Sequence, residues 1–406
     1  MKSIVFLGTN KSGSSYEGIK AAKRLGYETI LLTNRTIFLE ERECFQEIDD
    51  VRLINMSDTE EIFSAVTDLI VEEKKFVCFI SFLDEYTYLA ATLTNIICNS
   101  PLTIEPLKIM TDKILTRNYL SGKSYNPFFR VLNATDTIIE EINGLKHQFP
   151  LIIKAPQSNG SKDVILVEDI WECKKAIKHL HHKNSDSPLL IEEYLKGPQY
   201  LIEVVVCDST VTIVAIVEQE VTKGERFIIT GYSICPKMSL EHLSGLKETV
   251  FSIMEDFQFR NGTCHLEMRL TDKGWRLIEI NPRMAGGAMN RMIEEAFGYN
   301  LAEQTIKLYA GLVPKFTKEH ENAVYTHYLI VGSIGELLKV SGCDSAKKQV
   351  GVIEVYTKAE QGQIVTPPRS MGQRYGYVLA SADTKDQAKK CAINGAHQIQ
   401  FYLQPI

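Results

Sequence analysis

The chain has 406 residues, 44% hydrophobic and 24% charged, a length that allows two or three domains with substantial cores. Its formal net charge of −6 argues against a nucleic-acid-binding or membrane-surface protein, which would show clustered basic charge. It has no run of the ~18 apolar residues that a membrane-spanning helix needs, and the short apolar run near its start does not suit a signal peptide. Nine scattered cysteines without a C-x-x-C pair indicate reduced thiols and a cytoplasmic protein.

The first hundred residues alternate between strand and helix patterns. We expect strands at 4–7, 29–34 and 76–81, and helices at 16–28, 58–73 and 85–98. This order predicts a parallel α/β domain over residues 1–112. The loop at 8–15, GTNKSGSS, lacks the G-x-G-x-x-G pattern, so we expect a plain turn there rather than a dinucleotide site.

The remainder reads as antiparallel sheet with interspersed helices. A helix at 104–123 carries Lys113, and LIIKAPQSNGSKDVILVED at 151–169 reads as strand, loop and strand. A hairpin is expected at 262–281, with its turn at 271–274. We place further domain boundaries to give 113–195 and 196–406.

Each arm of that hairpin presents one polar face, because side chains alternate along a strand. The two faces hold His265, Glu267 and Arg269 on the first arm, and Leu277, Glu279, Asn281 and Arg283 on the second. Pairing the arms brings Glu267 near Glu279 and Asn281, an all-oxygen set that suits Mg²⁺. Mg²⁺ also holds substrate phosphates, which the planar guanidinium of Arg283 would match. A surface hairpin with solvated charges is the alternative.

Lys154 ends an apolar strand, an unusual place for a charge unless it faces a ligand. The loop after it is rich in small residues and could fold over phosphates with Ser158, Gly160 and Ser161. A hairpin loop with a lysine at its rim is the alternative.

In this order the motifs resemble the ATP-grasp superfamily over nearly the whole chain. The resemblance implies a parallel N-terminal α/β domain, a small mobile lid subdomain and a mainly antiparallel α+β C-terminal domain. It implies ATP and Mg²⁺ as cofactors, with Mn²⁺ as a substitute. The implied ATP-binding residues are Lys113, Lys154, Ser158, Gly160, Ser161 and the adenine hinge Glu192, Glu193, Tyr194 and Leu195. Glu267, Glu279 and Asn281 are the implied metal ligands, and Arg283 is the implied catalytic residue.

Within the superfamily, EINPRMAGGAMNRM and the C-terminal RYGYVLASA look most like bacterial L-amino-acid ligases. This resemblance implies that two amino acids are joined through an aminoacyl phosphate, with release of ADP and phosphate. Gly287 would leave room for a long first amino acid, and Gly286 and Gly287 could turn N–H groups toward a carboxylate. Glu85 could bind a cationic group, which makes arginine a hypothesis for the first substrate. Asp84 could do the same or cap a helix.

Several points stay open at this stage. His265 is either a general base or a hydrogen-bonded structural histidine. A carboxylase-like enzyme acting on bicarbonate, another ligase of the same fold and a non-catalytic ATP-binding regulator are the alternative functions. We expect small-molecule amino acids as partners, no nucleic acid or membrane partner, and a homodimer, since this branch often dimerises.

Overall fold

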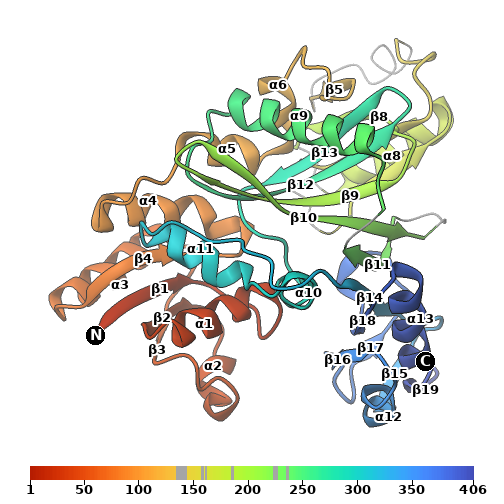
Figure 1. Cartoon of the computed structure of the whole chain (residues 1–406). Helices are drawn as coiled ribbons and strands as arrows, with labels where there is room; N and C mark the ends of the chain where they lie inside the picture. Colours follow the sequence, from red (N-terminus) through yellow and green to blue (C-terminus); the bar gives the residue numbers. More distant parts are fainter. Residues whose placement is uncertain (134–143, 157–159, 161, 184–186, 223–226, 235–236) are drawn as a thin grey trace.

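The computed structural model describes residues 1–133, 144–156, 160, 162–183, 187–222, 227–234 and 237–406 (Figure 1). Predicted Ser158 and Ser161 lie outside these residues. In the part of the chain described, no helix is long and apolar enough to cross a membrane. The eight cysteines with a described position are all free thiols.

The N-terminal region is a parallel four-stranded sheet in the order β3-β2-β1-β4. Its strands are β1 (Lys2–Leu7), β2 (Glu28–Thr33), β3 (Asp50–Leu53) and β4 (Lys75–Ile80). Its helices are α1 (Ser14–Arg24), α2 (Ile37–Glu40), α3 (Thr59–Val71) and α4 (Thr87–Cys98), with short 3-10 turns η1 (Arg42–Cys44) and η2 (Asp84–Tyr86). The predicted parallel α/β arrangement is confirmed. The carboxyl ends of β1 and β4 lie at one edge, where ligands bind in such sheets.

Two short helices connect this region to the next. They are α5 (Glu105–Met110) and α6 (Lys113–Tyr119). The side chain of Asp112 accepts hydrogen bonds from the N–H groups of Ile114 and Leu115, so it caps α6 and starts that helix at Lys113. The prediction of one continuous helix over 104–123 was therefore wrong.

A second sheet is small and antiparallel, in the order β5-β8-β6-β7. It contains β5 (Phe129–Leu132), β6 (Leu151–Lys154), β7 (Val164–Val167) and β8 (Leu189–Glu193), and α8 (Ile170–Lys183) packs on it. This unit has its own apolar core, built from residues such as Ile153, Ile177 and Ile191. Strands β6 and β7 form the predicted strand–loop–strand unit.

The largest sheet has eight antiparallel strands in the order β13-β12-β9-β10-β11-β14-β18-β16. The strands are β9 (Gln199–Cys207), β10 (Thr210–Val221), β11 (Ile229–Ile234), β12 (Gly262–Thr271), β13 (Gly274–Asn281), β14 (Ala323–Leu329), β16 (Val352–Thr357) and β18 (Gly376–Ala382). Its helices are α9 (Leu240–Asp256), α10 (Met289–Phe297), α11 (Leu301–Tyr309), α12 (Cys343–Lys347) and α13 (Lys385–Ala396). A three-stranded sheet of β15 (Gly335–Ser341), β17 (Ile364–Val365) and β19 (Gln400–Gln404), with the turn η3 (Met371–Gln373), completes the C-terminal region.

One apolar core joins the N-terminal sheet to the large sheet. Ile4 and Phe6 on one face of β1 belong to the same cluster as Leu266 of β12 and Met292 of α10. Helices α10 and α11 lie between the two sheets (Figure 1). The opposite face of the N-terminal sheet packs separately against α3 and α4. The boundaries at 112 and 195 stay predictions, and this core crosses both.

Candidate active site

Two carboxylates face each other across the hairpin of β12 and β13. Glu267 lies directly opposite Glu279, and His265 lies opposite Asn281. A register shift then places Met268 opposite Leu277, so β13 carries one extra residue at this point. Such a bulge reverses the alternation of side chains, and Leu277 is fully buried in the main core. The prediction that Leu277 shares the polar face of Glu279 was therefore wrong.

The facing carboxylates have the chemistry of a site for a hard divalent cation. Burial, and then repulsion by Glu279, raise the pKa of Glu267 to about 7. The Nδ2 group of Asn281 lies 3.2 Å from Glu279 Oε1. No group of three or more His, Cys, Asp or Glu residues able to hold a metal occurs among the described positions. Two carboxylates and an amide fit Mg²⁺, because this ion keeps several waters and takes substrate phosphates as further ligands.

The predicted nucleotide lysines lie close to this pair. The Nζ atom of Lys113 is 3.5 Å from Glu279 Oε1. Lys154 is buried at the end of β6, with its Nζ 2.7 Å from Glu192 Oε2. Both lysines thus reach acidic side chains that line one cavity with them.

Arg117 holds this part of the site together and was not singled out in the sequence. It is 1% exposed, and its Nε donates to Glu192 Oε1 at 2.6 Å. Its NH2 group donates to the carbonyl oxygens of Leu277 at 3.1 Å and Ile278 at 2.6 Å. Burial alone would raise the pKa of Glu192, but Arg117 and Lys154 outweigh it and lower that pKa. Arg117 follows Lys113 by one helical turn, a spacing that could have indicated a shared face.

The predicted adenine hinge is fixed by contacts on both sides. Glu193 Oε1 accepts from the Phe128 N–H at 2.8 Å, and the Tyr194 N–H donates to the Pro150 carbonyl at 3.1 Å. The Leu195 carbonyl accepts from Arg269 NH1 at 2.5 Å. The Glu192 carboxylate already binds Arg117 and Lys154, so this geometry favours a positioning role over direct adenine contact.

A cavity of about 110 Å³ gathers most of the predicted nucleotide-binding residues. Its lining includes Lys113, Lys154, Gly160, Glu192, Glu193, Tyr194, Leu195, Glu267 and Glu279. An adjoining cavity of about 160 Å³ shares Glu267 and Glu279 and continues to Asn281 and Arg283.

Arg283 connects the metal-side cavity with the N-terminal region. Its NH2 group forms an ion pair with Asp84 Oδ2 at 2.5 Å. Asp84 begins η2, where Leu83 is the N-cap residue and no side chain caps the turn, so the capping alternative for Asp84 is wrong. Both residues also line a third cavity, of about 390 Å³, on the N-terminal side.

His265 is buried and hydrogen-bonded at both ring nitrogens. Its Nδ1 lies 2.9 Å from the Arg283 carbonyl oxygen, and its Nε2 lies 3.2 Å from Asn281 Nδ2. Burial, with a further contribution from Arg283, lowers its pKa to about 4. A neutral ring that donates through Nδ1 and accepts through Nε2 satisfies both contacts. This geometry favours the structural role over the general base.

The 390 Å³ cavity also contains the predicted substrate residues Glu85, Gly286 and Gly287. Gly287 has a φ of 66°, and its carbonyl accepts from the Ser14 N–H at 3.0 Å. An added Cβ would lie 3.3 Å from the Tyr328 hydroxyl, so a side chain here would be strained and crowded. The loop at 8–15, predicted to be a plain turn, supplies several lining residues. Its position at the carboxyl end of β1 was the available signal.

Three family models match the chain. The ATP-grasp N-terminal domain matches residues 19–97, the ATP-grasp domain matches 147–291, and L-amino acid ligase C-terminal domain 2 matches 327–404. The chain is a member of the ATP-grasp superfamily, and its C-terminal region matches the L-amino acid ligase domain. The predicted fold class is thereby confirmed.

Known relatives of this ATP-grasp protein agree with that placement. Dapdiamide A synthase of Enterobacter agglomerans is 24% identical, over 61% of this chain and 61% of its own length. An L-arginine-specific L-amino acid ligase of Bacillus subtilis is 21% identical, over 56% of each chain. The chain thus spans little more than half the length of these relatives. The crystal structure of an L-amino acid ligase from Bacillus licheniformis has the same fold, with a TM-score of 0.84 at 17% identity, over 100% of this chain and 99% of that one.

ATP-grasp enzymes use ATP and a divalent metal ion, and solved members of the fold include ADP complexes. Glu267, Glu279 and Asn281 would hold the metal, and Lys113 and Lys154 would contact the phosphates. These roles stay predictions that the geometry supports.

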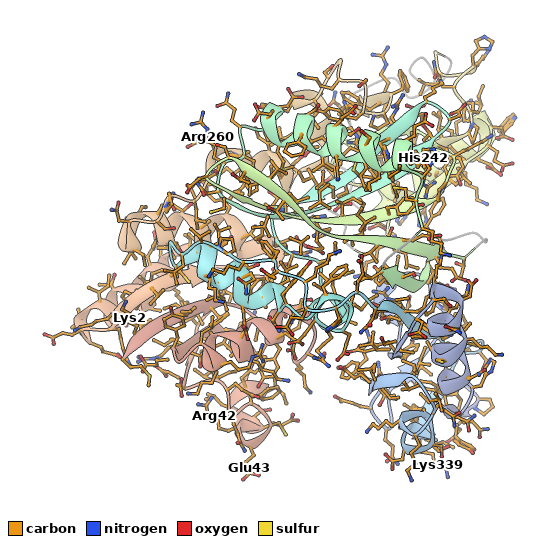
Figure 2. The ribbon with its side chains drawn as sticks, viewed as in Figure 1. Lys2, Arg42, Glu43, His242, Arg260 and Lys339 are labelled. Atoms are coloured by element: carbon orange, nitrogen blue, oxygen red, sulfur yellow. The ribbon has the colours of Figure 1, made fainter. Side chains whose placement is uncertain are left out.

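Removing Arg117 should destabilise the fold strongly. We expect Arg117→Ala to lower the free energy of unfolding by about 3–5 kcal/mol, because it leaves the buried Glu192 Oε1 and two carbonyl groups without their donor, while Lys154 still pairs with Glu192 Oε2. Urea unfolding measures this change. Arg260→Ala is the matched control, since Arg260 lies on the exposed surface (Figure 2), and it should change stability by no more than about 0.5 kcal/mol. Equal losses of unfolding free energy in Arg117→Ala and Arg260→Ala would contradict the structural role assigned to Arg117.

Glu203 of β9 is fully buried beside the Arg283 loop. It accepts from the Ala285 N–H at 3.0 Å, and its Oε2 has no hydrogen-bond partner among the described residues. Burial raises its pKa from the ordinary 4.5 to about 8. As the pH rises, the Glu203 carboxyl therefore loses its proton in the unfolded chain before it does so in the folded protein. The free energy of unfolding falls as the pH rises from about 4.5 to about 8.

Glu203→Gln should remove this pH dependence, because the amide keeps an acceptor oxygen but cannot ionise. Between about pH 5.5 and about pH 8, the variant should become more stable relative to the parent protein, by up to about 1.4 kcal/mol in the free energy of unfolding per pH unit. Its Tm relative to that of the parent protein should rise accordingly. Thermal unfolding at both values measures it, with the exposed Glu43→Gln as the control (Figure 2). A relative Tm that does not change with pH would show that Glu203 is ionised in the folded protein.

Proposed function

We propose that this protein joins two L-amino acids into a dipeptide, through an aminoacyl phosphate, and releases ADP and phosphate. One observation carries the proposal: Glu267 and Glu279 line both the cavity of the predicted nucleotide residues and an adjoining cavity with Arg283, and Arg283 also lines the cavity of the N-terminal region. A terminal phosphate and a substrate carboxylate could therefore meet at this arginine.

The side chains at this junction suit phosphoryl transfer to a carboxylate. A carboxylate oxygen of the first amino acid attacks the γ-phosphorus, the bond to the ADP oxygen breaks, and the acyl phosphate then has a good leaving group. Lys113, Lys154 and Arg283 would neutralise charge that develops on the transferring phosphoryl group. A divalent metal at Glu267, Glu279 and Asn281 would supply further neutralisation. The turn η2, which carries Asp84, and the segment after β13, which carries Arg283, would align the carboxylate of the first amino acid with the γ-phosphate of ATP.

The identity of the first amino acid is the finer part of the proposal. The relative from Bacillus subtilis is named for arginine, and Glu85 is an exposed acid on the wall of the 390 Å³ cavity. Gly287 adds no side chain to that wall. Both features support a long, basic first amino acid such as arginine.

The reaction class is tested by offering ATP, Mg²⁺ and pairs of amino acids, then measuring ADP, phosphate and product mass. ADP release should require an amino acid, and Glu279→Gln should lower kcat/KM about 100-fold or more by removing a metal ligand. Glu241→Gln, an exposed acid on α9, should leave the rate unchanged. Formation of AMP and pyrophosphate would overturn the proposal. So would bicarbonate-stimulated ATP hydrolysis without an amino acid, or ATP binding without turnover.

Specificity for the first amino acid is tested at Glu85. Glu85→Gln should lower kcat/KM for arginine about 5- to 10-fold, the loss of one charge-assisted contact at an exposed site, and leave kcat/KM for alanine unchanged. Steady-state ADP release with each amino acid measures both values. If the parent protein uses alanine and arginine equally well, the basic preference is wrong.

A further inference from the structure

A large cavity between the N-terminal and C-terminal regions has no role in the function proposed so far. It measures about 790 Å³ and is lined by the loop at 10–13, by Gly287 and by residues of β14, β16 and β18. Three tyrosines, Tyr328, Tyr356 and Tyr377, form an aromatic part of its wall.

Arg374 lines this cavity and forms no ion pair with a carboxylate in the part of the chain described, while the Glu267 carboxylate acts on its charge from farther away. Its guanidinium carbon lies 3.8 Å from the ring centre of Tyr328 and 5.9 Å from that of Tyr232. Its NH1 group reaches the Ile229 carbonyl only at 3.4 Å, and its buried Nε has no hydrogen-bond partner in the described part of the chain. The guanidinium also contacts the Tyr232 hydroxyl, so Nε is the donor left unused by the described residues. A guanidinium held on an aromatic ring with an unused donor is suited to a planar anion.

The charge of the whole lining also favours an anion. Four cations line the cavity, Lys11, Arg35, Lys358 and Arg374, against two carboxylates, Glu41 and Glu360. Both carboxylates are already paired with Lys11, at 3.9 Å and 3.4 Å. Lys358 donates to the Gly372 carbonyl and Arg35 to the Asn10 amide, which are neutral groups. The cavity therefore keeps an uncompensated positive charge.

This cavity adjoins both parts of the candidate active site. It shares Asn10, Ser12, Arg35 and Gly287 with the 390 Å³ cavity, which contains Asp84 and Arg283. It shares Met371 with the 160 Å³ cavity at the metal side. A molecule bound at Arg374 can thus extend toward the point where the acyl group would form.

We propose that Arg374 binds the α-carboxylate of the second, amine-donating amino acid, and that Tyr328, Tyr356 and Tyr377 receive its apolar or aromatic side chain. The inference rests on the proposed function and names the substrate class of its second half. The amine nitrogen attacks the acyl carbon, the C–N bond forms, and the C–O bond to phosphate breaks with its electron pair leaving on phosphate. The ammonium nitrogen first loses one proton to solvent, which the cationic surroundings favour, and the second proton leaves with the departing phosphate as the amide forms.

Three acceptors separate a failure of this inference from a failure of the proposed function. Hydroxylamine has no carboxylate and traps an acyl phosphate as the hydroxamate, so it reports the first half-reaction alone. Phenylalanine and phenylalaninamide differ only in the group that Arg374 would bind. The parent protein should use phenylalanine about 10- to 100-fold more efficiently, in kcat/KM, than its amide.

Arg374→Ala should lose that discrimination and raise the KM for phenylalanine by a similar factor. Its hydroxamate formation and its KM for ATP should match those of the parent protein. Arg369→Ala is the matched control on the same segment, because Arg369 is exposed, and it should keep the discrimination. Arg374→Lys, which keeps the charge but not the fork, should retain part of the discrimination.

The outcomes are distinct. No hydroxamate from the parent protein with any amino acid would overturn the proposed function. Hydroxamate formation together with an unchanged preference for phenylalanine over its amide in Arg374→Ala would overturn the assignment of Arg374 alone. A rise in the KM for ATP instead would assign Arg374 to the phosphate side. If Arg374→Ala does not fold, the Arg374→Lys variant decides, and full discrimination in that variant counts against the inference.

Discussion

The whole candidate site depends on two like charges held face to face. Glu267 and Glu279 are neighbours across β12 and β13, an arrangement that costs free energy unless a cation lies between them. A bulge in β13 turns Leu277 into the core while Glu279 stays on the polar face. The hairpin therefore gives up some stability to keep an all-oxygen site open, as functional sites commonly do.

Around this pair, buried cations fix the walls of the site. Arg117 joins α6, β8 and β13, and Arg269 joins the hinge at Leu195 to β12. Arg283 does the same between β13 and the N-terminal region, through Asp84. Each of these arginines presents several donors in a rigid plane, so one side chain can orient two or three elements. The geometry of the site is thus set by long side chains as much as by the sheets.

Local sequence patterns predicted the parallel N-terminal α/β region, the antiparallel character of the remainder and the pairing of Glu267 with Glu279, because strand periodicity and turn residues are read over short distances. The ATP-grasp fold class came from the resemblance of the ordered motifs. They did not predict the bulge that buries Leu277, since one extra residue leaves no mark in an apolar pattern. They also missed Arg117, Arg374 and the lining role of the loop at 8–15. These depend on contacts between residues far apart in the chain, such as Arg117 with Glu192 and Gly287 with Ser14.

The shared core described for the N-terminal sheet has a consequence for how the chain is made. One face of that sheet, with Ile4 and Phe6, is covered by α11 and by the cluster around Met292, which follow much later in the sequence. During translation this apolar face therefore stays without these packing partners until the residues of α10 and α11 have been synthesised. The small sheet with α8 encloses a core of its own and can complete folding as soon as it emerges.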